Sequence, residues 1–450
     1  MTLADLAFLV AYLSPLLLGL LLLSGLPHPR MGPAGRLGAG FALGTVLTTW
    51  WATCLSLVGI PWSLLSIGLP LLALAMMVAW RGRNALAVKA PGASTRQGTA
   101  LLLIGLSALY LVLALLAAGA TSVDLFYFWG VKSIHFLLAR GLDASVLSWR
   151  YALHAHSNYP PLLPISFVWA ALASGGFSWW GSILTTAVWW AATVPLVAAL
   201  LRPRLGRSVS FAVTAFWAAA LALSLAASHS GGNAEAPLLF FLTVAGCGLL
   251  GETEATASGR RWIVALALAG AVLSKNEGLV EAGLLVAAAL ATDLLQRKPQ
   301  PLKRLAVLVL PSVIAYAPWL TFELVHGLPI SDPTREPLFP IHIAHWSEVA
   351  RLGLENLGAG SWGLTWILPL LLALLFLPRL SKPVALSVLP GLTFVSGMFL
   401  FFAFYYLHFP GDPSELVAWS LSRISQPALS LWIVTAACGS IPSVDTSRQL

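Results

Sequence analysis

The stretch that decides the fold is "LLLIGLSALYLVLALLAAG", residues 101–119. It carries no charge, and its length approaches the ~20 apolar residues that a helix needs to cross the hydrocarbon core of a bilayer. Similar runs recur along the 450-residue chain, which is 58% hydrophobic and 9% charged, with a mean hydropathy of +0.85. A soluble domain does not have this composition. The sequence therefore predicts an all-α, polytopic membrane protein whose surroundings are a lipid bilayer.

Hydropathy predicts about thirteen transmembrane helices, within a range of 11–14. The predicted spans are 3–26, 37–59, 61–80, 99–119, 180–201, 208–227, 237–251, 262–274, 279–295, 305–325, 362–378, 384–407 and 427–441. The first three form a predicted N-terminal membrane module, 1–98. The remaining ten form a second membrane domain, 99–441, which a short cytoplasmic tail, 442–450, follows.

Basic residues cluster in alternate loops, for example at 81–96, 202–207 and 297–304. The positive-inside rule places such loops in the cytoplasm. They also account for the net charge of +8, so nucleic acid is not expected as a partner. If the chain crossed the membrane twice between residues 161 and 201, Arg202–Arg207 would lie on the outer side of the membrane, against this rule. Residues 161–176 are therefore expected to lie at the membrane surface or to insert only in part.

The loops on the opposite, outer face are predicted at 120–160, 228–236, 274–278, 326–361 and 408–426. They hold eight of the nine histidines and most of the other distinctive polar side chains. The chain has no Walker A sequence, HExxH, GxSxG or haem motif, and no visible internal repeat. Function is therefore expected on the outer face.

The first outer loop opens with "TSVDLFYFWGVKSIHF", residues 121–136. Asp124 follows an apolar helix directly, where an acid is costly and often functional, although an anchor at the helix end is the simpler explanation. The aromatic, amphipathic segment after it fits a helix in the membrane interface, with Lys132 at the level of the lipid head groups.

Two further stretches carry polar groups on this face. In "HAHSNYPPLLP", 154–164, His154 and His156 could ligate a metal, but their spacing favours a polar pocket that they line together with Asn158 and Tyr159. In "SHSGGNAEAP", 228–237, Glu235 is expected at a helix start, where the helix dipole favours an acid. A tight turn between two helices explains the second stretch equally well.

The last two stretches add cations. "LSKNEGLVE", 273–281, places Lys275, Asn276 and Glu277 between short apolar segments, where they either line a cavity or form a self-compensating Lys275–Glu277 pair. "DPSELVAWSLSRISQP", 412–427, puts Arg423 just before the last span. Arg423 is expected either to extend to the lipid head groups or to bind a phosphate.

Taken together, the early acid, the aromatic segment, "NYPPLLP", the loop acid and "SKNEG" resemble the GT-C superfamily of glycosyltransferases. The resemblance is closest to the bacterial branch related to protein O-mannosyltransferases and to the aminoarabinose transferase of lipid A. It covers roughly residues 99–290, with weaker similarity to about residue 430. It implies a GT-C-like catalytic domain in the bacterial inner membrane, with its active site on the periplasmic face.

The resemblance also implies a polyprenyl-phosphate sugar donor, a glycan, lipid or protein acceptor, and Asp124 as the catalytic carboxylate. Asp124 would act as general base in an inverting transfer, and Lys132, Lys275 and Arg423 would bind the donor phosphate. The acceptor or sugar pocket would comprise His154, His156, Asn158, Tyr159, Glu235, Asn276 and Glu277.

The chain departs from the family pattern at two places. Leu125 and Phe126 follow Asp124, which argues against a metal site made of paired acids. No metal ligand and no cofactor are therefore assigned, although the sequence does not exclude a divalent metal ion. The aminoarabinose branch has a lysine before its Pro-Pro, whereas this chain has Tyr159. A different cation would therefore have to meet the phosphate.

Two other functions compete with this interpretation. An O-antigen polymerase or ligase would need an arginine-rich late outer loop, but 326–361 offers only Arg335 and Arg351. A secondary transporter or lipid flippase would need a structural repeat and charges through the bilayer centre. Both are weaker matches to a chain whose polar groups gather on one face.

Overall fold

The computed structural model describes residues 1–26, 31–81, 98–119, 122–148, 159–228, 231–250, 252, 257–328, 343–358, 360–376, 382–408 and 413–440. All regular elements in these residues are helices. Nine segments are long and apolar enough to cross a membrane. They are Leu3–Gly25 (α1 Leu3–Leu13 and α2 Pro15–Gly25), α3 Pro33–Leu57, Leu64–Arg81 (η1 Leu64–Gly68 and α4 Leu69–Arg81), α5 Gly98–Ala118, α9 Trp179–Leu205, α10 Arg207–Ala227, α13 Asn276–Leu295, α14 Pro301–Val325 and Val384–Leu407 within α17 (Lys382–Leu407).

The other described elements are shorter or more polar. They are η5 Leu125–Trp129, α6 Gly130–Ala139, α8 Leu162–Ser174, α11 Glu235–Leu250, α12 Ala257–Ser274, η8 Ile343–His345, α15 Trp346–Gly358, α16 Gly360–Phe376, α18 Pro413–Ile424 and α19 Gln426–Ser440. A helix lies at each of the thirteen predicted spans. The all-α, multi-pass membrane fold is thus confirmed, whereas thirteen crossings remain a prediction.

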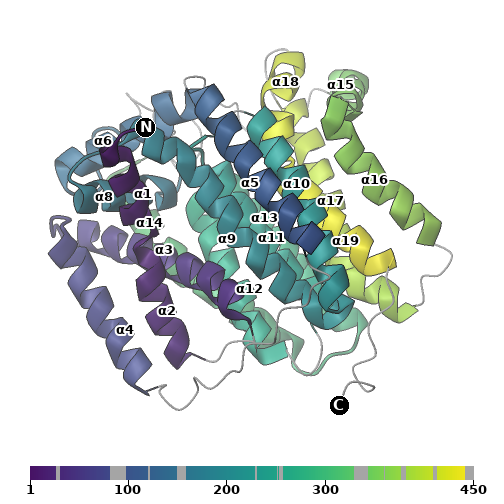
Figure 1. Ribbon diagram of the computed structural model, residues 1–450, viewed down its shortest axis with the longest axis horizontal. Coiled ribbons are helices and arrows are strands. Elements are labelled where there is room, and N and C mark those ends of the chain that lie inside the picture. The colour runs from purple at the N-terminus through teal and green to yellow at the C-terminus, as the bar shows by residue number, and fades with distance from the viewer. Residues whose placement is uncertain are drawn as a thin grey trace.

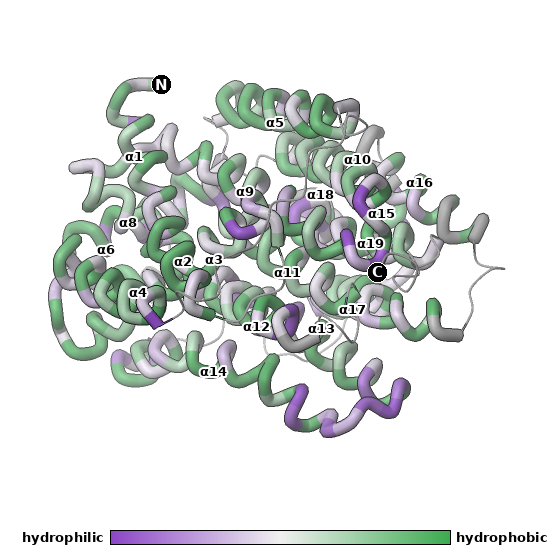
Figure 2. Tube along the Cα trace, turned by 60° about the horizontal axis from the view of Figure 1, so that its bottom comes forward, coloured by the Kyte–Doolittle hydropathy of each residue, from purple (hydrophilic) through white to green (hydrophobic). Residues whose placement is uncertain are grey.

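The long helices lie side by side, and α6, α15 and α18 gather at the upper end of the bundle in Figure 1. Most of the trace is apolar, and strongly hydrophilic residues occupy short segments (Figure 2). The basic groups at 202–207, 260–261 and 297–304 share one end, here the basic end. Arg260 donates to the Leu200 carbonyl, and Arg261 and Arg304 bind the same two acids. Asp124 and the start of α11 lie at the opposite end, here the site end. Among the described residues, these basic groups are therefore separated from the polar residues around Asp124 and Glu235.

The segment with the ambiguous topology forms α8. Pro161 precedes this helix, where a missing backbone N–H costs nothing. Its 13 residues correspond to about 20 Å, which is shorter than the ~30 Å hydrocarbon core. Most of its side chains are buried against α1, α3 and α6. The length of α8 thus fits a segment that does not cross the membrane.

The N-terminal helices share one core with the rest of the bundle. Tyr12 of α1 accepts a hydrogen bond from the Trp189 indole of α9 at 2.7 Å. The helices α2 and α3 approach closely through the small residues Gly19, Gly40 and Gly44, and a methyl group at Gly44 would lie 1.8 Å from the Pro15 carbonyl oxygen. Small residues at helix interfaces permit such contact in membranes, where packing rather than the hydrophobic effect drives helix association.

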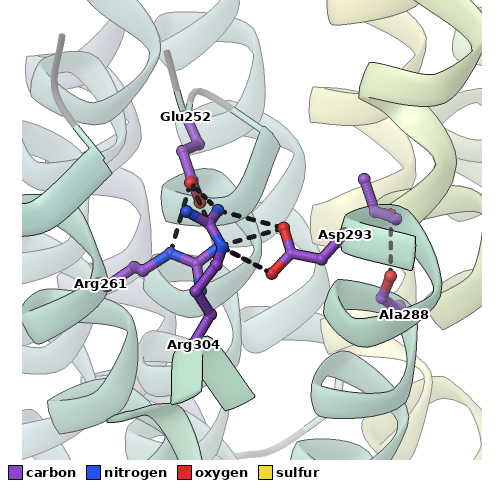
Figure 3. Close-up of polar contacts among 6 residues, drawn as sticks. Glu252, Arg261, Ala288, Asp293 and Arg304 are labelled. Carbon is purple, nitrogen blue, oxygen red and sulfur yellow. Dashed lines mark hydrogen bonds and ion pairs between the residues drawn. The ribbon is translucent and has the colours of Figure 1, made fainter. Parts of the chain in front are cut away.

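Four charged side chains join the helices at the basic end (Figure 3). Arg261 of α12 donates to Glu252 at 3.2 Å and to Asp293 of α13 at 3.1 Å. Arg304 of α14 donates to the same two acids at 2.7 and 2.9 Å. Two cations and two acids thus neutralise one another, and they tie the ends of α11, α12, α13 and α14 together.

We expect Gly44→Ala to destabilise the protein by about 1–3 kcal/mol, because the added methyl group overlaps the backbone of α2. The measurement is the midpoint of thermal unfolding in detergent. Gly105→Ala on α5 is the matched control, since a methyl group there meets no atom within 4 Å. Equal midpoints for the two variants would contradict the close approach of α2 and α3.

We expect Asp293→Asn to cost about 3 kcal/mol, because it leaves Arg261 and Arg304 with one remaining charged partner in a largely buried cluster. Thermal unfolding measures this effect as well. Glu355→Gln, which breaks the exposed Arg351–Glu355 pair on α15, should change the stability by less than about 0.5 kcal/mol. Similar losses in both variants would argue against the tie at the basic end.

Candidate functional site

Four charged side chains from distant parts of the chain meet at the site end. Arg423 of α18 contacts Asp124 through an ion pair, and its Nη1 lies 3.9 Å from Glu235 Oε1. Lys275 Nζ lies 3.2 Å from Glu235 Oε1. These four side chains, together with Glu277 and Glu281, are called the charged cluster below. The convergence joins the segment after α5, the start of α11, the α12–α13 junction and the end of α18.

The backbone around Asp124 and Glu235 is held by hydrogen bonds between the two loops. The Ser122 hydroxyl lies in hydrogen-bonding distance of the Gly231 carbonyl and the Asn233 side chain. Gly232 adopts φ +72°, a conformation that favours glycine, and its N–H donates to Thr186 Oγ1 at 2.9 Å. Glu235 then begins α11, as the sequence predicted. The predicted tight turn between two helices is therefore present, and it places Glu235 next to Asp124.

Lys275 is shared between two acids. Its Nζ lies 3.2 Å from Glu277 Oε1 as well as from Glu235 Oε1, so the predicted Lys275–Glu277 pair forms but is not self-contained. Lys275 precedes α13, and Glu277 lies in its first turn. Burial lowers the pKa of Lys275, but the two carboxylates raise it by more, and the net result is a pKa well above the ordinary value. Lys275 is therefore a permanent cation.

Two aromatic rings border the cluster. Tyr159 donates its hydroxyl to Glu277 Oε1 at 3.4 Å, and its ring centre lies 5.5 Å from Lys275 Nζ. Trp129 stacks on the Tyr159 ring with centres 5.7 Å apart. Tyr159 stands where the resemblance expects a lysine. In this chain its ring and hydroxyl hold the Lys275–Glu277 pair instead.

Sequence reasoning missed Glu281, which is only 1% exposed. It lines a cavity of about 10 Å³, the size of one water molecule, together with Glu235, Lys275, Glu277 and Arg423. The signal was present in the sequence, because Glu277 and Glu281 are four residues apart and so lie on one helix face. The charged cluster thus has four acids and two cations.

Burial and the nearby Glu235 carboxylate raise the pKa of Asp124 above its ordinary value, although Arg423 and Lys275 oppose the shift. A carboxylate with a raised pKa is a stronger base than an exposed aspartate. Arg423 stays charged, because Glu235 and Asp124 raise its pKa by more than burial lowers it. The cluster therefore pairs a basic carboxylate with fixed positive charge.

Lys132 is buried inside the protein, so the expectation that its side chain would meet the lipid head groups was wrong. Its side chain is fully buried, with Nζ 3.4 Å from the Tyr159 carbonyl oxygen and 5.6 Å from the Trp129 ring centre. Burial lowers its pKa to about 7, although the Glu323 carboxylate of α14 opposes the shift. Lys132 turns inward because α6 buries the face that carries it against α8. Tyr159 links Lys132 to the charged cluster.

The remaining predicted residues contribute less to the described site. His154, His156 and Asn158 lie outside the described residues. Asn276 is the half-buried first residue of α13 and adjoins Lys275. Within the part of the chain that the structure describes, no group of three His, Cys, Asp or Glu side chains has the arrangement of a metal site.

An apolar groove of about 280 Å³ adjoins the cluster at the site end. It runs between α15, α17 and α18 and is lined by side chains that include Val349, Phe399, Phe402, Tyr406 and Leu421. Leu421 lies two residues before Arg423, and Tyr406 contacts Ser420 on the same helix at 3.0 Å. The site end thus offers an apolar surface next to its arginine.

Comparisons with known proteins give no relative. No protein-family model matches the chain, and neither the curated proteins nor the solved structures contain a match. The GT-C resemblance therefore rests on the short sequence motifs alone.

We expect Lys275→Met to destabilise the protein by about 3–5 kcal/mol, because it leaves Glu235 and Glu277 buried without their shared cation. Thermal unfolding in detergent measures the change. The double variant Lys275→Met/Glu277→Gln should recover part of the loss, since it removes one of the two uncompensated charges. A double variant less stable than Lys275→Met would refute the shared pairing.

Proposed function

We propose that the protein is an inverting glycosyltransferase of the GT-C type, which uses a polyprenyl-phosphate sugar as donor. The observation that carries the proposal is the meeting of Asp124, Glu235, Lys275 and Arg423 at the site end. Asp124, Glu235 and Lys275 come from segments that suggested the family, and Arg423 was predicted separately as a candidate phosphate ligand. The opposite end carries the basic loops, which supports a location of the site on the non-cytoplasmic face.

In the proposed reaction Asp124 accepts the proton of an acceptor hydroxyl. The hydroxyl oxygen then forms a bond to the anomeric carbon of the sugar, from the side opposite the phosphate. The bond between that carbon and the phosphate oxygen breaks, and polyprenyl phosphate leaves with the electron pair. The raised pKa of Asp124 suits this role, because the carboxylate binds a proton more readily than an exposed aspartate.

Arg423 is the residue best placed to bind the departing phosphate. Its guanidinium matches phosphate geometry, and positive charge aimed at a leaving anion lowers the barrier. Because Arg423 contacts Asp124, a phosphate bound to Arg423 would compete with the carboxylate for the same N–H groups. Donor binding would then make Asp124 available to the acceptor. The adjoining apolar groove offers room for part of a lipid donor.

We expect Asp124→Asn to abolish sugar transfer while the protein stays folded and inserted, because the amide keeps the shape but cannot accept the proton. The measurement is mass spectrometry of cell-surface glycans and polyprenyl-linked sugars. It compares cells that carry Asp124→Asn, cells that carry the control variant described below and cells that lack the gene. Donor should accumulate where transfer fails.

Asp143→Asn is the matched control for this experiment. Asp143 lies at the same end, but it accepts hydrogen bonds from Ser145 and lies outside the charged cluster. It should leave the glycan profile as in the wild type. Normal transfer by Asp124→Asn would exclude Asp124 as the base. An unchanged profile without the gene would reject the whole proposal.

A second function, cation-coupled transport, draws support from Glu281. This acid lies inside a candidate membrane span and is buried next to Glu235 and Glu277, as the acids of ion pathways often are. Uptake of a labelled solute by vesicles, without covalent transfer, would favour transport. If the Glu281→Gln variant still transfers sugar, Glu281 takes no part in the transfer reaction.

A further inference from the structure

A second apolar groove, of about 440 Å³, lies between α2, α3, α12 and α14. The side chains that line it include Leu43, Leu47, Trp50, Trp262, Leu266 and Ile314. None of the residues of the charged cluster belongs to its wall. The groove is therefore a feature separate from the proposed active site.

The groove opens on the lateral surface of the bundle. Trp262, Leu310 and Ile314 line it and are 55%, 57% and 52% exposed. In a membrane, such an apolar lateral surface faces lipid. The Trp50 indole donates to the Ile314 carbonyl at 3.0 Å, so α3 and α14 are joined at the wall of the groove. The groove thus has fixed walls and an open side.

Positive charge gathers where the groove approaches the basic end. The helices α3, α12 and α14 all begin at that end, and their N-terminal N–H groups favour an anion. Arg36 precedes the lining residue Ala39 by three positions, and Lys303 precedes Leu310 by seven, so each cation lies on the face that lines the groove. Neither side chain has an acidic partner among the described residues.

We propose that this groove binds an anionic glycerophospholipid of the leaflet at the basic end. One acyl chain fills the groove, and the phosphate lies beside Arg36 and Lys303. The lining of α3 from Ala39 to Trp50 spans about 16 Å, which is roughly the depth of one leaflet of a ~30 Å hydrocarbon core. The proposal does not depend on glycosyl transfer.

A phospholipid matches both features of the surface at once. Its acyl chain suits a groove with an almost wholly apolar lining, and its head group suits cations on the same helix faces. A partner helix or a second copy of this chain would cover the apolar part, but it would leave Arg36 and Lys303 without a counter-charge. Basic pockets between membrane helices on the cytoplasmic side are known to bind anionic head groups.

The test is native mass spectrometry of the full chain in detergent, titrated with phosphatidylglycerol or with phosphatidylcholine of the same acyl chains. We expect the wild type to retain one phosphatidylglycerol in preference to phosphatidylcholine. Arg36→Ala/Lys303→Ala should bind phosphatidylglycerol about thirtyfold more weakly. Arg202→Ala, which removes an exposed cation on α9 at the same end, is the control and should bind as the wild type does.

A second pair of variants tests the apolar part and does not depend on the charges. Leu310→Trp fills the groove from its open side and should weaken the binding of both lipids. Leu302→Trp, at a 73% exposed position of α14 outside the groove, should not. Equal retention of the two lipids by the wild type, a lipid-free dimer, or full binding by Leu310→Trp would each overturn the proposal.

Discussion

The Lys275 ammonium is the charge on which the site end depends. It is buried, and an isolated charge in an apolar interior costs several kcal/mol, so its place is tolerable only because Glu235 and Glu277 both lie 3.2 Å away. This requirement brings the start of α11 to the α12–α13 junction. Glu235 in turn attracts Arg423, and Arg423 pairs with Asp124. In the series Lys275, Glu235, Arg423 and Asp124, each charge thus lies next to a charge of opposite sign.

The basic end meets the same constraint in a different way. There Arg261 and Arg304 share Glu252 and Asp293, so the charges balance in number and tie four helices. At the site end four acidic side chains face two cations around a small cavity, so the acids outnumber the cations. A balanced cluster suits a structural tie. The cluster at the site end keeps a basic carboxylate, and for this reason the proposed chemistry is placed there.

Hydropathy was sufficient to predict the long apolar helices, because an apolar run inside a bilayer must satisfy its own backbone hydrogen bonds and a helix does so. It did not predict α15 and α18, which lie in segments predicted as loops. Proximity among the charges was harder to predict. Asp124 and Arg423 were each singled out, but their pairing across 299 residues depends on how α18 packs, which no local pattern records. Glu281 was missed although its spacing from Glu277 was visible. Lys132 was placed at the surface because an amphipathic pattern does not tell which partner covers the polar face.

The separation in sequence between the charged partners sets an order for their assembly. Lys275 and Glu235 are 40 residues apart and can pair while the chain is still being synthesised. Asp124 must wait until α18 has emerged before it meets Arg423, close to the C-terminus. A chain that stops before residue 423 would therefore leave Asp124 without its arginine partner. Among the contacts of the charged cluster, the Asp124–Arg423 pair is therefore the last to form. It is also the pair that donor binding would separate first in the proposed reaction.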